Sequence, residues 1–203
     1  MEAFLAATKY VDYNDEAIQQ KAKELFFDCM SDVEKAEIAY KFVRDNIIHS
    51  FDCGAEVITA RASEVLKAGT GICHAKANLL AALLRSQGIP AGFCFEHITL
   101  ADDESLGYCV HAYNAVWLDG RWIRLDARGS TNGTNAQFSL GEPVLAYPPR
   151  EQYDEYFFNG IYSRPHQESM DMLEKAESLQ DIIDNIPEYI TDAPDEEFDY
   201  YGK

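Results

Sequence analysis

The first part of the chain carries apolar residues at helical spacing. The segment "NDEAIQQKAKELFF", residues 14–27, predicts a helix that Asn14 caps. A second helix is predicted to begin at "SDVE", where Ser31 and Glu34 match the capping-box pattern. Each helix presents one apolar face, formed by Ile18, Ala22, Leu25 and Phe26 in the first helix and by Ile38 or Ala39, Phe42, Val43 and Ile47 in the second.

Two more helices are predicted before the pattern changes. The polar stretch over residues 49–62 predicts a loop, and "SEVLKAG", residues 63–69, a short helix. The next helix is expected to begin at about Ile72 and to end before Gly88, because glycine suits the position after a last turn and Pro90 follows it. Helices therefore lead the chain.

Strand-like segments follow these helices. The runs "AGFCFEHI", "CVHAYNAVW" and "RWIRLDA" are rich in β-branched and aromatic residues, and the Asp-Gly pair at 119–120 predicts a tight hairpin between the last two. Further on, residues 169–186 predict a final amphipathic helix that stops before Pro187. Helices, then a sheet, then a helix indicate a single α+β domain over residues 1–203.

Charge and composition narrow the classes of function. The net charge of −18 argues against binding to nucleic acid or to an anionic membrane, because phosphate-binding faces need clustered lysine and arginine. Residues 187–203 are strongly acidic; we interpret them as a solvated, partly disordered tail, or alternatively as a self-occluding segment anchored by Phe198, Tyr200 and Tyr201. With no long apolar segment, no basic leader and an odd cysteine count, we expect a cytoplasmic protein with reduced thiols.

Cys73 stands in "GTGICHAKANLL", at the predicted start of a helix. A thiol in the first turn faces unpaired backbone N–H groups and the positive end of the helix dipole, which lower its pKa and raise the thiolate fraction. The same N–H groups can stabilise an oxyanion on an attacked carbonyl. Cys73 is therefore a candidate nucleophile, with a purely structural thiol as the alternative.

The predicted hairpin offers this thiol a base and a carboxylate. If residues 119–120 form a two-residue turn, His111 and Asp126 lie diagonally on one face of the two strands. Diagonal Cβ atoms lie roughly 7 Å apart, a gap that long side chains bridge. We predict that Asp126 accepts a hydrogen bond from Nδ1–H of His111 and leaves Nε2 for the thiol.

The two faces of the hairpin differ in character. One face carries Ala112, Val116, Leu118, Ile123 and Leu125, broken only by Asn114, and is predicted to pack on the core. The other face, with its imidazole, carboxylate and two arginines, is not expected to cover a core. Its further candidates for binding substrate are Tyr113, Arg124 and Arg128, the arginines either through a substrate carboxylate or, alternatively, in structural ion pairs.

A zinc site is the first alternative interpretation, because the chain holds close Cys/His pairs. Their spacings match no ribbon or knuckle pattern, so no metal or organic cofactor is expected. His74 lies about 100° around the helix from Cys73 and is interpreted as a rim or core histidine. Cys29 and Cys94 are predicted to be core residues. The four pairs are His49 with Cys53, Cys73 with His74, Cys94 with His97, and Cys109 with His111.

Together, "GTGICHAKANLLAALLRSQGIPAGF" and "HAYNAVWLDGRWIRLDARG" resemble the transglutaminase-like superfamily, over about residues 36–129. Members place Cys, His and Asp in this chain order on a papain-like α+β core, here about residues 33–130, in which the Cys-bearing central helix packs on an antiparallel sheet. The resemblance, which extends to small bacterial members described as cysteine proteases, implies Cys73 as nucleophile, His111 as base and Asp126 as orienter.

The sequence also departs from the family. Tyr113 stands where many members have Trp, and both tryptophans follow Cys73, so the upstream Trp that holds the oxyanion in the eukaryotic crosslinking enzymes is absent. The backbone N–H of Cys73 is one oxyanion donor to be expected, and the second is unassigned.

These residues predict cysteine-dependent cleavage or transfer at amide bonds through a thioester acyl-enzyme. The expected partner is a peptide or protein amide, and hydrolysis is favoured because nothing in the sequence marks an amine site. The alternatives are transglutaminase-type transfer to an amine, a catalytically inert binding module of the same fold, and the zinc site.

Overall fold

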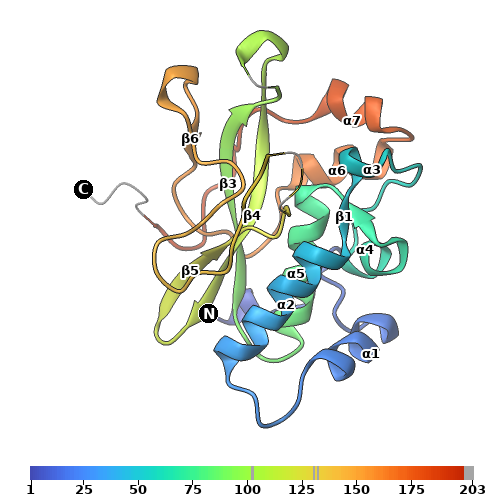
Figure 1. Ribbon diagram of the computed structural model, residues 1–203, viewed down its shortest axis with the longest axis vertical. Helices are drawn as coiled ribbons and strands as arrows, with labels where there is room; N and C mark the ends of the chain where they lie inside the picture. The colour runs from blue at the N-terminus through green and yellow to red at the C-terminus, as the bar shows by residue number, and fades with distance from the viewer. Residues whose placement is uncertain (102, 130, 132, 199–203) are drawn as a thin grey trace.

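Helices gather on one side of an antiparallel sheet (Figure 1). The structure is a computed structural model that describes residues 1–101, 103–129, 131 and 133–198. The chain passes from helices through strands to two closing helices, which confirms the predicted α+β class. The helices are α1 (Glu16–Leu25), α2 (Asp32–Asn46), α3 (Ser50–Cys53), α4 (Ala62–Ala68), α5 (Cys73–Arg85), α6 (Gln167–Lys175) and α7 (Leu179–Asn185), the strands are β1 (Ile48–His49), β2 (Thr70–Gly71), β3 (Ala91–Thr99), β4 (Tyr108–Leu118), β5 (Arg121–Leu125) and β6 (Tyr156–Phe157), and short 3-10 turns span Glu2–Leu5, Glu104–Leu106 and Glu151–Tyr153.

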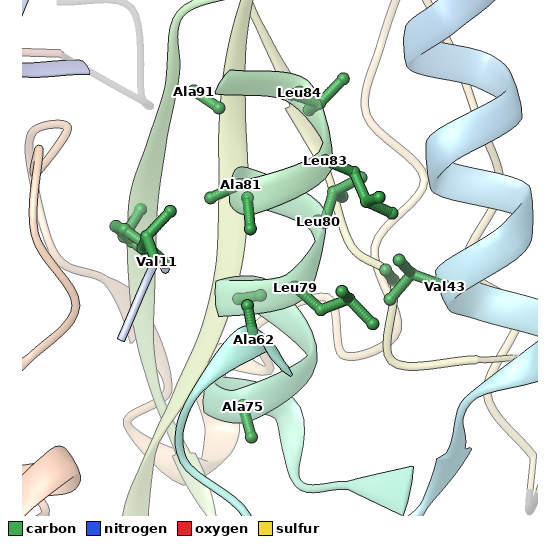
Figure 2. Packing of buried hydrophobic residues seen from close by; sticks show 14 of the residues in the cluster. Val11, Val43, Ala62, Ala75, Leu79, Leu80, Ala81, Leu83, Leu84 and Ala91 are labelled. Atoms are coloured by element: carbon green, nitrogen blue, oxygen red, sulfur yellow. The ribbon is translucent and has the colours of Figure 1, made fainter. Parts of the chain in front are cut away.

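Helix α5 lies at the centre of the protein. Every residue from His74 to Arg85 is buried, and Figure 2 shows the α5 leucines facing Val43 of α2, with the sheet on the other side of the helix. Each buried leucine stabilises the fold by roughly 1.5–3 kcal/mol. The helix that carries Cys73 at its first position is thus held firmly between α2 and the sheet. No helix among the described residues is long and apolar enough to cross a membrane.

Three buried polar side chains of α5 donate hydrogen bonds to backbone carbonyls. Nζ of Lys76 donates to the backbone carbonyl of Ile47. Nδ2 of Asn78 donates to the carbonyl of Ala60 at 2.8 Å. The guanidinium of Arg85 donates to three backbone carbonyls. Because an unpaired buried polar group costs about 1–3 kcal/mol, these bonds tie α5 to the surrounding chain at defined points.

The hairpin between β4 and β5 has the predicted register. Asp119 and Gly120 have φ of 51° and 81°, the positive values of a two-residue hairpin turn, and Asn114 pairs with Leu125. The four-stranded sheet has the order β5-β4-β3-β6. Asn114, the polar residue on the core face, donates from Nδ2 to the carbonyl of Ala77 at 3.1 Å, so it joins the sheet to α5.

The opposite face of the hairpin also covers a core, which corrects the prediction that it would not. Tyr113 and Ala115 pack there with Phe4, Cys94, Leu145 and Ile161 in a second, smaller cluster. Trp122 lies against this cluster and meets Phe4 edge to face at 4.8 Å. The residues that cover this face come from the N-terminal turn and from the segment after residue 140. The alternating pattern of the hairpin itself does not reveal that these distant segments pack against it.

Several helix boundaries differ from the predictions. Asp15 rather than Asn14 caps α1, with Oδ1 accepting from the N–H of Ala17 at 2.8 Å. The predicted loop over residues 49–62 holds the end of β1 and all of α3. The predicted final helix divides into α6 and α7, because the chain extends at Ala176 and Ser178 then caps α7 through its hydroxyl. The capping box at Ser31 is confirmed.

The acidic tail stays exposed or half-buried as far as it is described, but part of it hydrogen bonds to the body of the protein, and its solvated, partly disordered state stays a prediction. The N–H of Ile161 donates to the carbonyl of Glu196 at 2.8 Å, and that of Ser163 donates to Oδ2 of Asp195 at 2.7 Å. Phe198 packs against the second cluster. Tyr200 and Tyr201 lie outside the described residues.

Candidate active site

Cys73 is the first residue of α5, as the sequence predicted. Ile72 occupies the N-cap position and makes no side-chain cap, so backbone N–H groups of the first turn are left for another acceptor. Gly69 ends α4 in the left-handed conformation, with φ of 69°. Strand β2 then pairs in parallel with β1, which sets Gly71 opposite His49. The thiol is partly exposed at this helix start.

His111 and Asp126 come together as the hairpin register predicts. Nε2 of His111 lies 3.0 Å from Oδ2 of Asp126, and the residues are only 3% and 1% exposed. The predicted choice of nitrogen was wrong: Asp126 holds Nε2, and Nδ1 is the nitrogen left for the thiol. Asp126 follows the last residue of β5, so its carboxylate meets the far edge of the ring rather than the edge near the backbone.

Backbone groups fix the carboxylate of Asp126. Oδ2 also accepts from the N–H of Ala146 at 2.9 Å, and Oδ1 accepts from the N–H of Arg128 at 2.9 Å. Burial raises the pKa of Asp126, but the charge of His111 and these hydrogen bonds outweigh it and lower the pKa below its ordinary value. Asp126 is therefore a fixed, ionised acceptor.

The thiol and the imidazole have opposed pKa shifts. Burial raises the pKa of Cys73, yet the charges of His74 and His111 and hydrogen bonding to His111 and His49 bring it well below the ordinary value. Burial lowers the pKa of His111, yet the charges of Asp126 and Cys73 bring it well above the ordinary value. The two groups stabilise each other as thiolate and imidazolium.

Glu96 is a second buried carboxyl beside the same ring, and the sequence pattern gave no reason to expect it there. It lies opposite His111 across the β3–β4 pairing, is fully buried, and has Oε1 3.9 Å from Nε2 of His111. Neither oxygen has a hydrogen-bond partner among the described residues. Burial raises the pKa of Glu96 well above its ordinary value, which favours the neutral acid.

Two further histidines contact the thiol. Nδ1 of His74 lies 3.3 Å from Sγ of Cys73, so the expectation that it points away was wrong; helical side chains lean toward the N-terminus, which brings this ring back over the preceding residue. It is buried and stacks on Phe95, as expected of a core histidine. His49 hydrogen bonds with Cys73 and stacks on Phe51. The pairing of residues 48–49 with 70–71 brings His49 to this place, and a pairing of two residues is too short to predict from sequence.

A cavity of about 470 Å³ opens beside Cys73 and His111. The ring of Tyr147 meets His111 edge on, at 5.0 Å between ring centres, and forms part of the wall. The volume suits a side chain and adjoining backbone of a bound peptide. The other lining residues are His49, Phe51, Ile72, Ile98, Thr99, Leu100, Ala101, Cys109, Val110, Arg128, Ala146, Pro148, Arg150, Glu155 and Ile186.

The three candidates for binding substrate occupy different places. Arg128 lines the cavity, but Nη1 and Nη2 donate to the two oxygens of Asp52 at 2.7 and 3.0 Å. Tyr113 is 1% exposed and stacks beside His111. The guanidinium of Arg124 lies over the ring of Phe157, 4.9 Å from its centre. These positions favour the structural interpretation, and contact of the three residues with substrate stays a prediction.

The four Cys/His pairs do not form a metal site among the described side chains. One group of three potential ligands occurs there, Glu96, His111 and Asp126, whose ligand atoms lie within 4.8 Å of one another. None of the five cysteines forms a disulfide, and Cys94 is buried as predicted. Cys29 is exposed, which corrects its assignment to the core, because α1 ends before it.

Two solved structures are similar to parts of this chain. Among solved structures, a "Putative Cysteine Protease from Cytophaga hutchinsonii" is 21% identical with a TM-score of 0.49, covering 62% of this chain and 40% of that chain. A structure described as a TGase is 16% identical with a TM-score of 0.40, covering 65% of this chain and 35% of that one. The chain thus spans less than half the length of either. No curated protein matches the sequence.

The sequence model of the transglutaminase-like superfamily matches residues 19–127, which is more than half of the 203 residues and runs from α1 to just past Asp126. The match covers the central helix with Cys73 and strands β3, β4 and β5, the papain-like α+β arrangement that the sequence predicted. The chain belongs to the transglutaminase-like superfamily.

Proposed function

We propose that this protein is a cysteine-dependent hydrolase that cleaves an amide bond of a peptide or protein through a thioester on Cys73. His111 is the base and Asp126 orients it. One observation carries this proposal: a partly exposed thiol at a helix start adjoins an imidazole–carboxylate pair, with the pKa of the thiol lowered and that of the imidazole raised. Opposed shifts of this kind are typical of a nucleophile and its base.

The reaction divides into acylation and deacylation. The Cys73 thiolate attacks the carbonyl carbon, a C–S bond forms, and the carbonyl π electrons move to oxygen. When the C=O bond re-forms, the C–N bond breaks and the Nδ1–H proton of His111 passes to the leaving amine. In the second stage a water gives its proton to Nδ1 and attacks the thioester, which releases the acid and restores Cys73. Throughout, Asp126 holds Nε2–H and stabilises the imidazolium.

Hydrolysis is favoured over transfer to an amine because water reaches a partly exposed thiol freely, whereas no group among the lining residues marks an amine site. The two outcomes differ in product. With a glutamine-containing peptide and a fluorescent primary amine, a hydrolase leaves the peptide unlabelled and a transferase labels it in proportion to amine concentration. A cytoplasmic setting, in which thiols stay reduced, is part of the proposal, since none of the five cysteines forms a disulfide.

The reactivity of Cys73 toward iodoacetamide tests the nucleophile. Because its pKa is lowered, Cys73 should be alkylated at pH 6 about tenfold or more faster than the exposed Cys29 and Cys53, as read by mass spectrometry of peptides. His111→Ala should remove most of this advantage, since the thiolate then loses its cation.

Equal labelling of Cys73 and Cys53 at pH 6 would show that Cys73 is not an activated thiol. A panel of electrophilic cysteine probes, applied to the wild type and to Cys73→Ala, then separates an enzyme from an inert module. Labelling that persists in Cys73→Ala would place the reactive group elsewhere and overturn the assignment.

A further inference from the structure

The oxyanion of the proposed reaction needs a second hydrogen-bond donor beside the backbone N–H of Cys73. We infer that a ring N–H of His49 is that donor, an inference that rests on the proposed function. His49 lines the same cavity as Cys73 and His111. It is 8% exposed and hydrogen bonds with the thiol that would be acylated.

The position of His49 is set by backbone pairing. Strands β1 and β2 pair in parallel with His49 opposite Gly71, two residues before Cys73. A Cβ at Gly71 would lie 3.1 Å from the side chains of Thr59 and Ala75, so glycine lets the chain pass this point closely. The pairing thereby places the imidazole of His49 beside the start of α5, although His49 lies 24 residues before Cys73 in the sequence.

Packing holds the ring once it is there. His49 stacks on Phe51 with the ring planes 29° apart. Helix α3 follows directly and is tied down by the ion pair of Asp52 with Arg128, whose side chains are only 8% and 6% exposed. Arg128 in turn gives its N–H to Asp126. One chain of contacts therefore holds the proposed donor and the orienting carboxylate in register, which is the preorganisation that an oxyanion site requires.

The charge state of His49 suits a donor rather than a base. Burial lowers its pKa, and the charge of Arg128 acts in the same direction, so the ring is neutral near pH 7 and carries one N–H. Nδ1 is buried without a hydrogen-bond partner among the described residues, and the charge of Asp52, which favours a second proton, does not outweigh burial. His111 is held by the carboxylate of Asp126 and acts as base, whereas His49 keeps its single proton throughout the reaction.

His74, the other histidine at the thiol, is placed differently. Its ring stacks on Phe95 in the interior and is 1% exposed. It is not among the described residues that line the cavity, where the acyl group must sit. Only His49 and His111 therefore combine contact with the thiol and a place in the cavity wall, and His111 is already committed to proton transfer.

Two reactions of the same thiol test the inference. Acylation by p-nitrophenyl acetate passes through an oxyanion, whereas alkylation by iodoacetamide does not. His49→Phe keeps the stacking on Phe51 but removes the donor, so its acylation rate should fall about 100-fold. Alkylation should fall far less, because the mutation removes only the smallest of the named contributions that lower the pKa of Cys73. His49→Gln offers an amide N–H at similar reach and should recover at least about tenfold of the lost acylation rate.

Each other outcome overturns a defined statement. Acylation of His49→Phe at the wild-type rate would remove His49 from the oxyanion site. Acylation and alkylation that fall by the same factor would show that His49 acts only by stabilising the thiolate. A wild type that shows neither fast alkylation at pH 6 nor an acylation burst would remove the proposed function itself. Circular dichroism melting of both variants identifies unfolding, and the ratio of the two rates in His49→Gln is unaffected by partial loss of folded protein.

Discussion

Asp126 and Glu96 are two buried carboxyl groups beside one imidazole, and the protein holds them in opposite states. Asp126, in the turn after β5, accepts three hydrogen bonds and has a lowered pKa. Glu96, in the middle of β3, has no hydrogen-bond partner among the described residues and a raised pKa. Burial is nearly the same for both. The donors, rather than depth, therefore decide which carboxyl is ionised.

The difference matters for the charge balance around His111. A thiolate, an imidazolium and one carboxylate leave this buried cluster with a single negative charge. A second ionised carboxyl 3.9 Å from Nε2 would compete with Asp126 for the ring and would add an uncompensated buried charge. Neutral Glu96 leaves the orientation of His111 to Asp126 alone.

The largest expected effect comes from replacing the ionised member. Asp126→Asn keeps the shape but removes the charge that stabilises the imidazolium, and its amide can present N–H to Nε2 and favour the wrong tautomer. We expect acylation by p-nitrophenyl acetate to slow by about 10³- to 10⁴-fold. Stopped-flow measurement of nitrophenol release gives this rate.

Asp45→Asn is the matched control for this change, because Asp45 is exposed and its side chain bonds to the neighbouring Arg44, away from His111. It should acylate at the wild-type rate. A loss of less than tenfold in Asp126→Asn would mean that His111 does not depend on the carboxylate, and the contrast between the two carboxyls would lose its catalytic meaning.

Part of this site could be predicted from the sequence. The Asp-Gly turn fixed the β4–β5 register, so His111 and Asp126 were placed on one face by counting residues. Glu96 could not be placed in the same way, because β3 and β4 are joined by a longer connection that contains no two-residue turn signal. The pairing of Glu96 with His111 is therefore visible only in the folded chain.

Two other features of the molecule cannot be predicted from the sequence for related reasons. The contact of His49 with Cys73 depends on a two-residue parallel pairing that leaves no periodic pattern in the sequence. The second, smaller cluster, on the face of the hairpin that carries Tyr113, depends on Phe4 and Leu145, which come from distant segments. Local signals such as the capping box and the helix start at Cys73 were predictable because they involve neighbours in the sequence.

A smaller effect is expected on stability when the neutral carboxyl is replaced. The unfolded chain ionises Glu96 around its ordinary pKa of 4.5, whereas the folded protein keeps the proton well above this value. Between the unfolded and the folded pKa of Glu96, unfolding releases a proton, so rising pH favours the unfolded state. The stability that protonated Glu96 contributes is therefore complete below pH 4.5 and is lost as the pH rises toward the folded pKa. Glu96→Gln has no such proton to lose.

Glu96→Gln should therefore be more stable than the wild type near neutral pH. The gain should grow as the pH rises from 5 to 7, by at most about 1.4 kcal/mol per pH unit. Urea unfolding at pH 5, 6 and 7 measures the free energy of unfolding of both proteins. A difference that does not change with pH would show that Glu96 is ionised in the folded protein, and the two carboxyls would then be alike.

The smallest expected effect is that of Glu96→Gln on catalysis. The substitution is chemically the same as Asp126→Asn, a carboxyl replaced by its amide, but it exchanges one neutral group for another. Because no charge beside His111 changes, the acylation rate at pH 7 should stay within about threefold of the wild type, measured by the same nitrophenol release. A loss as large as that of Asp126→Asn would instead mean that the acid proton of Glu96 itself takes part in holding the His111–Asp126 pair. Comparing Asp126→Asn with Glu96→Gln thus separates a carboxyl whose negative charge acts on His111 from a carboxyl that is neutral and leaves His111 unaffected.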